Sequence, residues 1–184
     1  PLFAHDIYLT NLAAADAQIR KRSIASQIQE MERCHQLGIQ GLVCHMGSHV
    51  DCSLGLRRLS QAIGQVLAHS PADVQMLLET CAGQGNCLGH RFEHLAYCLE
   101  RNPAVGVCLD TCHVLVAGYD LSSQEGYRLT WQHFDKLIGR QALKLLHLND
   151  SQKPCGSRVD RHHHIGQGAV GLEPFGWLVN DPQM

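Results

Sequence analysis

The chain has 184 residues, which is enough for one hydrophobic core and normally too few for two. Hydrophobic residues make up 45% of it and charged residues 17%, and no stretch approaches the roughly 18 apolar residues of a membrane span. The net charge of −2 argues against a protein that binds nucleic acid through a broad basic face. We therefore expect one domain over residues 1–184 and no membrane partner.

The nine cysteines are odd in number and do not form a CxxC pair. Cys44 and Cys108 lie within apolar runs, and Cys34 and Cys98 stand singly in stretches of helical pattern. These positions predict reduced thiols in a cytoplasmic protein rather than a disulfide framework or a cysteine-based zinc finger. The N-terminal residues carry no pattern of a signal peptide and no starting Met, so we expect the chain to begin inside a longer protein.

Five short apolar runs each end abruptly in a histidine, glutamate or aspartate. They are residues 2–4 before His5, 42–44 before His45, 76–78 before Glu79, 105–109 before Asp110, and 145–146 before His147. Continuous apolar runs are typical of parallel strands that are buried on both faces. The sequence therefore predicts five such strands, each with a polar residue at its C-terminal end.

Helical patterns separate the apolar runs. They cover residues 16–37, with Gly38 as the expected C′ residue; 53–69, which stops before Pro71; 90–101; and a helix that a capping box of Ser122 and Glu125 opens and that runs to Ile138. The order of the elements is thus strand, helix, strand, helix. Such an alternation indicates an α/β protein with a parallel sheet.

The spacing of the five polar residues that end the apolar runs favours a barrel. They lie 40, 34, 31 and 37 positions apart, and a (β/α)8 TIM barrel uses about 31 residues for each of its eight units. The chain would then supply five or six units, so we expect an incomplete barrel that lacks N-terminal and C-terminal βα units. A doubly wound open sheet is the alternative architecture.

A metal site is the chemistry that these strand ends favour. A single histidine or aspartate at a strand end is more often a hydrogen-bonded structural residue than a ligand. However, barrel enzymes build their sites at the C-terminal ends of several strands, and five uncompensated polar groups converging there would be costly. Histidine and carboxylate ligands without cysteine favour zinc or manganese. The chain also holds 13 histidines, and further candidate ligands are His113, Asp160 and His162.

Several segments resemble the signatures of the endonuclease IV family, in the same order along residues 1 to about 177. They are HLNDS at 147–151, GSRVDRH at 156–162 and IGQG at 165–168; GVCLDTCH at 106–113 and AGYD at 117–120; Glu79 with AGQG at 82–85; His45 with GSH at 47–49; and His5-Asp6 with Tyr8-Leu9. Members of this family are (β/α)8 barrels that hold three zinc ions.

The resemblance implies three ligand sets: His5, His45 and Glu79; Glu79, Asp110 and His147, with Glu79 bridging; and His113, Asp160 and His162. It implies that Glu79, His45 and Asp110 are catalytic and that Tyr8 and Leu9 enter the DNA at the lesion. A glutamate ligand that the family takes from its last strand is not in the chain. Departures from the family pattern include Met46, Asp51 and the pair Thr80-Cys81.

The activity that the resemblance implies is zinc-dependent hydrolysis of the DNA phosphodiester on the 5′ side of abasic sites, leaving a 3′-hydroxyl for base excision repair. The partner would be double-stranded DNA with abasic sites, and the complete protein would be a cytoplasmic, bacterial-type monomer. Two alternatives stay open. One is a sugar isomerase or epimerase on a related metal-dependent barrel, and the other is an inactive zinc-binding fragment that lacks the last-strand ligand.

Overall fold

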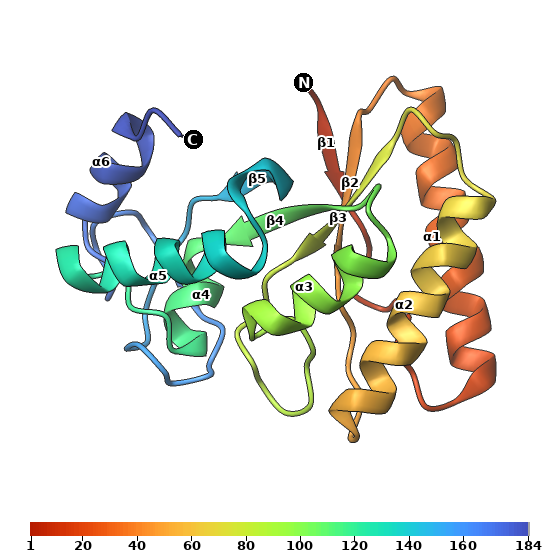
Figure 1. Cartoon of the computed structure of the whole chain (residues 1–184), viewed down its shortest axis with the longest axis horizontal. Coiled ribbons are helices and arrows are strands. Elements are labelled where there is room, and N and C mark those ends of the chain that lie inside the picture. Colours follow the sequence, from red (N-terminus) through yellow and green to blue (C-terminus); the bar gives the residue numbers. More distant parts are fainter. Residues whose placement is uncertain (184) are drawn as a thin grey trace.

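Five parallel strands form one sheet in which strand order follows chain order (Figure 1). The strands are β1 (Phe3–His5), β2 (Gly41–His45), β3 (Gln75–Glu79), β4 (Gly106–Asp110) and β5 (Leu143–His147). The structure is a computed structural model that describes residues 1–183. Sequential order of parallel strands is the topology of a barrel, whereas a doubly wound sheet reverses its order at a switch point. The predicted incomplete TIM barrel is therefore confirmed, and the doubly wound alternative is wrong.

Helices connect the strands and follow the last one along the chain. They are α1 (Ala17–Gln36), α2 (Cys52–Ala68), α3 (Phe92–Arg101), α4 (Thr111–Ala117), α5 (Gln124–Leu137) and α6 (Glu173–Asn180), with a 3-10 turn η1 (Arg140–Ala142) before β5. Helix α1 packs on α2, α2 on α3, and α3 on α5 (Figure 1). The predicted helices are present, whereas α4 was not predicted because its seven residues continue directly from a buried strand.

Capping residues set the limits of the helices. Asp16 opens α1 by accepting hydrogen bonds from the backbone N–H groups of Gln18 and Ile19 at 2.7 and 3.0 Å. The helix ends at Leu37, and the following Gly38 has φ +68°, a conformation that favours glycine. Gly38 therefore has the C′ role that the sequence predicts.

The predicted capping box of α5 is wrong by one residue. Ser123 is the N-cap, and its Oγ accepts a hydrogen bond from the backbone N–H of Gly126 at 3.1 Å. The hydroxyl of Ser122 instead donates to the carboxylate of Asp120 at 2.7 Å. Asp120 also accepts the hydroxyl of Ser123, so its carboxylate holds the whole turn that precedes the helix.

The three central strands, β2 to β4, are buried on both faces, as their continuous apolar runs indicate, whereas the edge strands β1 and β5 are partly exposed. In β3, Met76 and Leu78 pack in the large core between the sheet and the helices. Leu77 points to the opposite face, where it packs with Val43 and Cys108. Adjacent residues of a strand point to opposite faces, so an apolar residue is needed at each position.

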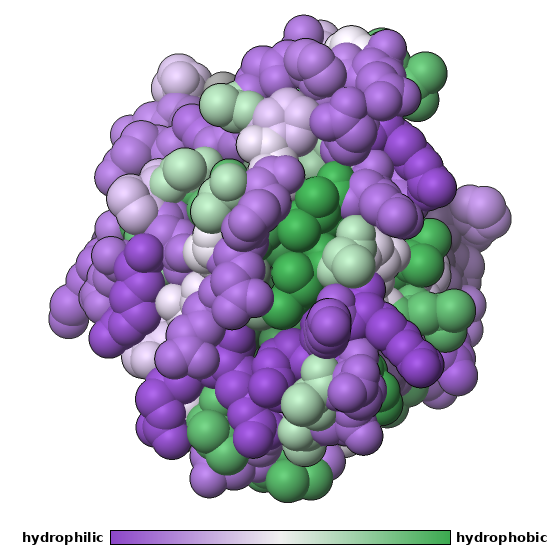
Figure 2. Space-filling model, turned by 90° about the vertical axis from the view of Figure 1, so that its right-hand side faces the viewer, coloured by the Kyte–Doolittle hydropathy of each residue, from purple (hydrophilic) through white to green (hydrophobic). Residues whose placement is uncertain are grey.

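The surface over α1 and α2 is mostly hydrophilic, with a narrow hydrophobic strip in its middle (Figure 2). Within residues 1–183, no helix combines the length and the apolar character needed to cross a membrane.

Candidate metal centre

Five polar side chains meet at the C-terminal edge of the sheet because neighbouring strands end in register. His45 at the end of β2 is the partner of Glu79 on β3, and Asp110 on β4 is the partner of His147 on β5. His5 ends β1 beside them. Parallel strands bring their carboxyl ends to one edge, so the residues that stand far apart in the sequence become neighbours.

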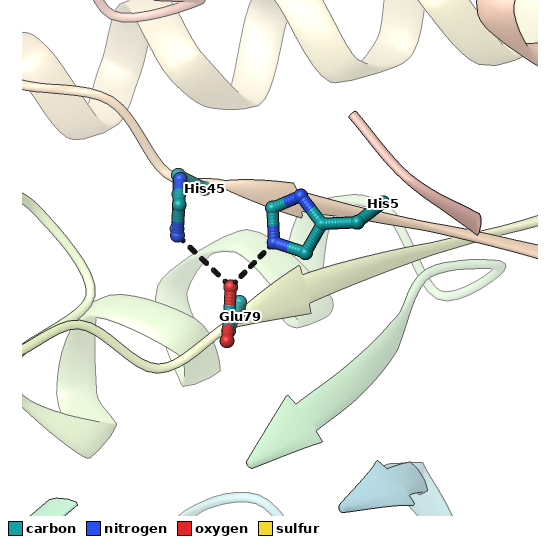
Figure 3. A group of neighbouring side chains, drawn as sticks. All are labelled: His5, His45 and Glu79. Atoms are coloured by element: carbon teal, nitrogen blue, oxygen red, sulfur yellow. Dashed lines mark hydrogen bonds and ion pairs between the residues drawn. The ribbon is translucent and has the colours of Figure 1, made fainter. Parts of the chain in front are cut away.

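Glu79 is the centre of this group. Its carboxylate is 2% exposed, and one oxygen lies 2.9 Å from Nε2 of His5 and 3.0 Å from Nε2 of His45. Figure 3 shows both imidazoles directed at this oxygen from β1 and β2. The other oxygen lies 2.7 Å from Nδ1 of His147. The two oxygens of Glu79 thus face different histidines, which is the arrangement a bridging carboxylate needs.

Asp110 connects the strand edge with the following helix. Its Oδ1 accepts a hydrogen bond from the backbone N–H of His113 at 3.0 Å, so Asp110 is the N-cap of α4. Its Oδ2 accepts a hydrogen bond from Nδ2 of Asn149 at 2.6 Å and lies 4.0 Å from Nδ1 of His147. One carboxylate therefore both faces the site and sets the start of the helix that carries His113.

A second group of donors lies next to the first. Asp160 places one carboxylate oxygen 3.1 Å from Nε2 of His113 and the other 3.2 Å from Nε2 of His162. Nδ1 of His113 lies 2.8 Å from the carbonyl oxygen of Thr80 and donates to it. This hydrogen bond fixes the ring and leaves Nε2 as the nitrogen that is directed at the site.

The loop that carries Asp160 and His162 is held by Asp150, whose role the sequence did not reveal. Asp150 is fully buried in the strand β6 (Asp150–Ser151), which pairs with β7 (His162–His163). Its carboxylate accepts hydrogen bonds of 2.7 to 2.9 Å from the backbone N–H groups of residues 151, 166, 168 and 170. The role depends on the folded path of the loop, because the donors are backbone groups.

The donor atoms are close enough to hold metal ions. Among residues 1–183, the groups with ligand atoms within 4.8 Å of one another are His5, His45 and Glu79; Glu79, Asp110 and His113; Glu79, Cys108 and His147; Asp110, Cys112 and His162; and His113, Asp160 and His162. The first and last are sets that the sequence predicts, whereas the predicted set of Glu79, Asp110 and His147 is not among these groups. Histidine nitrogens and carboxylate oxygens suit zinc and manganese. Glu79, Asp110 and His113 are buried, and their ligand atoms lie close enough together to bind a common cation, so the residues fit a metal centre.

In the metal-free chain, the electrostatics of the site favour an ionised Glu79 and a protonated His113. Burial alone would raise the pKa of Glu79, but hydrogen bonds from His147, His45 and His5 hold it well below its ordinary value. Burial lowers the pKa of His113, but the hydrogen bond to Asp160 and the nearby carboxylates outweigh this effect and raise the pKa to about 9. The same hydrogen bond lowers the pKa of Asp160.

Tyr8 and Leu9 lie at the mouth of the site with their side chains in solvent. Their exposed fractions are 83% and 87%, the two largest values among the exposed large hydrophobic residues of residues 1–183. The ring of Tyr8 lies 5.7 Å from that of His5 and 5.2 Å from that of His45. Both residues line a cavity of about 370 Å³ that also reaches Asp160.

The titration of Glu79 and His113 predicts how the stability of the metal-free chain depends on pH. The lowered pKa of Glu79 stabilises the fold above its ordinary pKa of 4.5, and this contribution is lost as the pH falls. The raised pKa of His113 contributes fully below 6.5 and is lost as the pH rises through about 9. In urea denaturation with chelator, we expect the free energy of unfolding to be greatest between about pH 4.5 and 6.5. A steady increase from pH 6.5 to 9 would contradict this expectation.

Replacing Asp150 by asparagine should loosen the loop that carries Asp160 and His162. An amide has one acceptor oxygen, so Asp150→Asn loses hydrogen bonds from buried backbone N–H groups. We expect a loss of at least about 2 kcal/mol in the free energy of unfolding, with faster hydrogen exchange at Gly166 and Gly168. Asp73→Asn, whose exposed carboxylate pairs with the exposed imidazole of His35, is the control and should change stability by less than about 1 kcal/mol. Equal stability of the two variants would refute the anchoring role.

Comparisons with known proteins agree with this geometry. A probable endonuclease 4 from Chloroflexus aurantiacus is 50% identical over the whole chain, which covers 66% of that protein. A probable endonuclease 4 from Geobacter sulfurreducens is 48% identical over 98% of the chain, and the aligned part covers 63% of that protein. The chain thus spans about two thirds of the length of these curated relatives.

Solved structures also include an endonuclease IV among the proteins that this chain resembles. The crystal structure of endonuclease IV from Thermus thermophilus matches the whole chain with a TM-score of 0.89 at 34% identity, and the chain covers 65% of it. A D-tagatose 3-epimerase-like protein matches with a TM-score of 0.75 over 97% of this chain and 67% of its own, but at 19% identity, which shows the fold alone. The model of the xylose isomerase-like TIM barrel family matches residues 1–184. The chain therefore belongs to the xylose isomerase-like TIM barrel family and is related, within it, to endonuclease IV.

Proposed function

We propose that the chain is the greater part of a zinc-dependent endonuclease that hydrolyses the DNA backbone on the 5′ side of abasic sites and leaves a 3′-hydroxyl. The observation that carries the proposal is the position of Glu79. Its buried carboxylate faces His5 and His45 with one oxygen and His147 with the other. The relatives named probable endonuclease 4 and the match to endonuclease IV support the nuclease activity.

The proposed metal ligands fall into three sets, two of which share Glu79. His5, His45 and Glu79 would hold one zinc ion; Glu79, Asp110 and His147 a second; and His113, Asp160 and His162 a third, with manganese as a substitute metal. When bound, such ions supply an acidified water and positive charge for the hydrolysis of a phosphate ester.

The protein's own residues set the charge of the site and hold the ligands in position. The three ligand carboxylates of Glu79, Asp110 and Asp160 carry less charge than three divalent cations, so the loaded site would be positive and would attract a phosphodiester despite the acidic net charge. Asn149 and the backbone of His113 keep the Asp110 carboxylate in place by hydrogen bonds. The hydrogen bond from His113 to the Thr80 carbonyl fixes the imidazole whose Nε2 faces the site.

Tyr8 and Leu9 are proposed to contact the DNA at the lesion. Both are exposed at the mouth of the centre, and the ring of Tyr8 lies over His5 and His45. An abasic nucleotide has no base pair to break, so its extrusion from the duplex costs less than that of an intact nucleotide. Two exposed apolar side chains beside the site would fill the space that the extruded residue leaves.

The second donor group favours the nuclease over a sugar isomerase or epimerase. A site for a small sugar needs fewer ligands than the eight residues that meet here, and the His113–Asp160–His162 group lies beside the first group rather than within it. The epimerase-like structures share the fold alone. The nuclease is therefore the function that the geometry supports best.

An incision assay tests the proposal. The substrate is a labelled DNA duplex with one chemically stable abasic analogue, and the enzyme is both the 184-residue chain and the product of its whole reading frame, each loaded with zinc. We expect incision 5′ to the lesion by the product of the whole frame, loss of incision in chelator, and recovery with zinc or manganese. Incision that persists in excess chelator would remove the metal from the proposal.

Comparison of incision by the 184-residue chain with incision by the product of the whole reading frame distinguishes the remaining alternatives. Incision by the longer protein alone would show that the 184-residue chain is an inactive zinc-binding part. Absence of incision by both proteins, with zinc measured in them, would refute the nuclease and favour a sugar substrate.

Glu79→Gln tests the shared carboxylate directly. The substitution keeps the shape of the side chain but removes its charge, so the centre should lose metal and the incision rate should fall by at least about 100-fold. Circular dichroism checks that the fold persists. Glu125→Gln, on the exposed first turn of α5, is the matched control and should cut at the normal rate. Near-normal incision by Glu79→Gln would disprove its bridging role.

A further inference from the structure

Thr80 contacts two of the proposed metal ligands through two different oxygen atoms. It directly follows Glu79 at the end of β3, and it is buried. Its hydroxyl oxygen accepts a hydrogen bond from the backbone N–H of Asp110 at 2.9 Å, and its carbonyl oxygen accepts one from Nδ1 of His113 at 2.8 Å. Thr80 belongs to the Thr80-Cys81 pair that departs from the family pattern, so the resemblance assigns it no role.

The Thr80 hydroxyl replaces a main-chain acceptor of the sheet. The N–H of Thr80 donates to the carbonyl of Cys108 at 3.0 Å, which continues the parallel pairing of β3 with β4 by one residue. In a regular parallel ladder, the carbonyl of Thr80 would then accept the N–H of Asp110, two residues after Cys108. The N–H of Asp110 instead donates to the Thr80 hydroxyl. The Thr80 carbonyl is thereby left for the imidazole of His113.

This exchange of acceptors determines how the His113 ring is oriented. Because Nδ1 donates to the Thr80 carbonyl, Nε2 is the nitrogen that faces Asp160, at 3.1 Å. A histidine ligand whose second nitrogen donates to a backbone carbonyl is held in one tautomer and one orientation. Without the hydroxyl, the N–H of Asp110 and Nδ1 of His113 would both turn to the same carbonyl oxygen.

We propose that the Thr80 hydroxyl is a positioning group for the zinc ion held by His113, Asp160 and His162. It takes the N–H of Asp110, and the Thr80 carbonyl then fixes the His113 ring with Nε2 directed at the metal position. The inference rests on the proposed zinc centre and adds to it a residue that is not itself a ligand. Removing the hydroxyl should weaken zinc binding at this position.

Thr130 offers a matched control. It is buried like Thr80, and its hydroxyl donates to the carbonyl of Asp120 at 2.9 Å. This hydrogen bond joins α5 to the turn before it, and neither residue belongs to the proposed ligand sets. Thr130→Val therefore removes a buried hydroxyl of the same kind without touching the metal centre.

A zinc titration of the ¹⁵N-labelled 184-residue chain tests the proposal without any assay of DNA cleavage. A competing chelator sets the free zinc concentration, and imidazole ¹H–¹⁵N spectra follow His113 and His162 separately from His5 and His45. We expect Thr80→Val to lower the zinc affinity at the His113 position by at least about 10-fold. Thr80→Ser, which keeps the hydroxyl, and Thr130→Val should bind zinc as the wild type does.

Urea unfolding of the metal-free proteins separates positioning from general stability. Thr80→Val and Thr130→Val each lose the hydrogen bond of a buried hydroxyl, so both should unfold at lower urea concentrations than the wild type. Only Thr80→Val should also lose zinc affinity. A loss of zinc affinity in Thr130→Val as large as that in Thr80→Val would show a general effect of stability and overturn the inference.

The outcomes distinguish the inference from the zinc centre on which it rests. Equal zinc affinity of Thr80→Val and the wild type would overturn the inference and leave the centre intact, and so would a loss in Thr80→Ser as large as that in Thr80→Val. A wild type that binds no zinc would refute the centre and the inference together. If Thr80→Val does not fold, the zinc-loaded wild type decides the question. Its His113 ring must carry the proton on Nδ1, and a proton on Nε2 would overturn the inference.

Discussion

The structure depends on a carboxylate that is buried at the end of a strand and shared by histidines from three other strands. Glu79 ends β3, in the middle of the sheet, and its charge is compensated by His5 and His45 on one side and His147 on the other. Removing such a charge from water is costly without partners. The parallel register of the strands, which aligns His45 with Glu79 and Asp110 with His147, supplies these partners.

Periodicity in the sequence was sufficient for the central strands, because continuous apolar runs are what a sheet buried on both faces requires. The choice of a barrel over a doubly wound sheet rested on the spacing of the strand ends, and the observed strand order decided it. Met76, Leu77 and Leu78 show this directly, since they pack on alternate faces and none contacts water. The limits of α5 were missed by one residue because Ser122 and Ser123 are equivalent as caps in the sequence. The carboxylate of Asp120, which binds both hydroxyls, determines which one caps the helix.

The candidate site, like the fold, could be predicted from the sequence only in part. The strand-end residues could be identified from the chain alone, whereas their division into ligand sets came from the resemblance to a family. The support around them could not be predicted from spacing. Asp150 acts through backbone donors, and the bond from His113 to the Thr80 carbonyl depends on how α4 begins. Such contacts follow from the path of the loops, which hydrophobic patterning does not specify.

Asp110 belongs to the metal centre and also caps helix α4, so metal binding and the position of this helix are connected. One oxygen starts α4 and thereby positions His113, and the other faces His147 and Asn149. Any cation that draws Asp110 toward itself would also shift the helix that presents His113 to Asp160. Occupancy of neighbouring positions would then be thermodynamically linked, with each ion changing the affinity for the next by the same factor in either order.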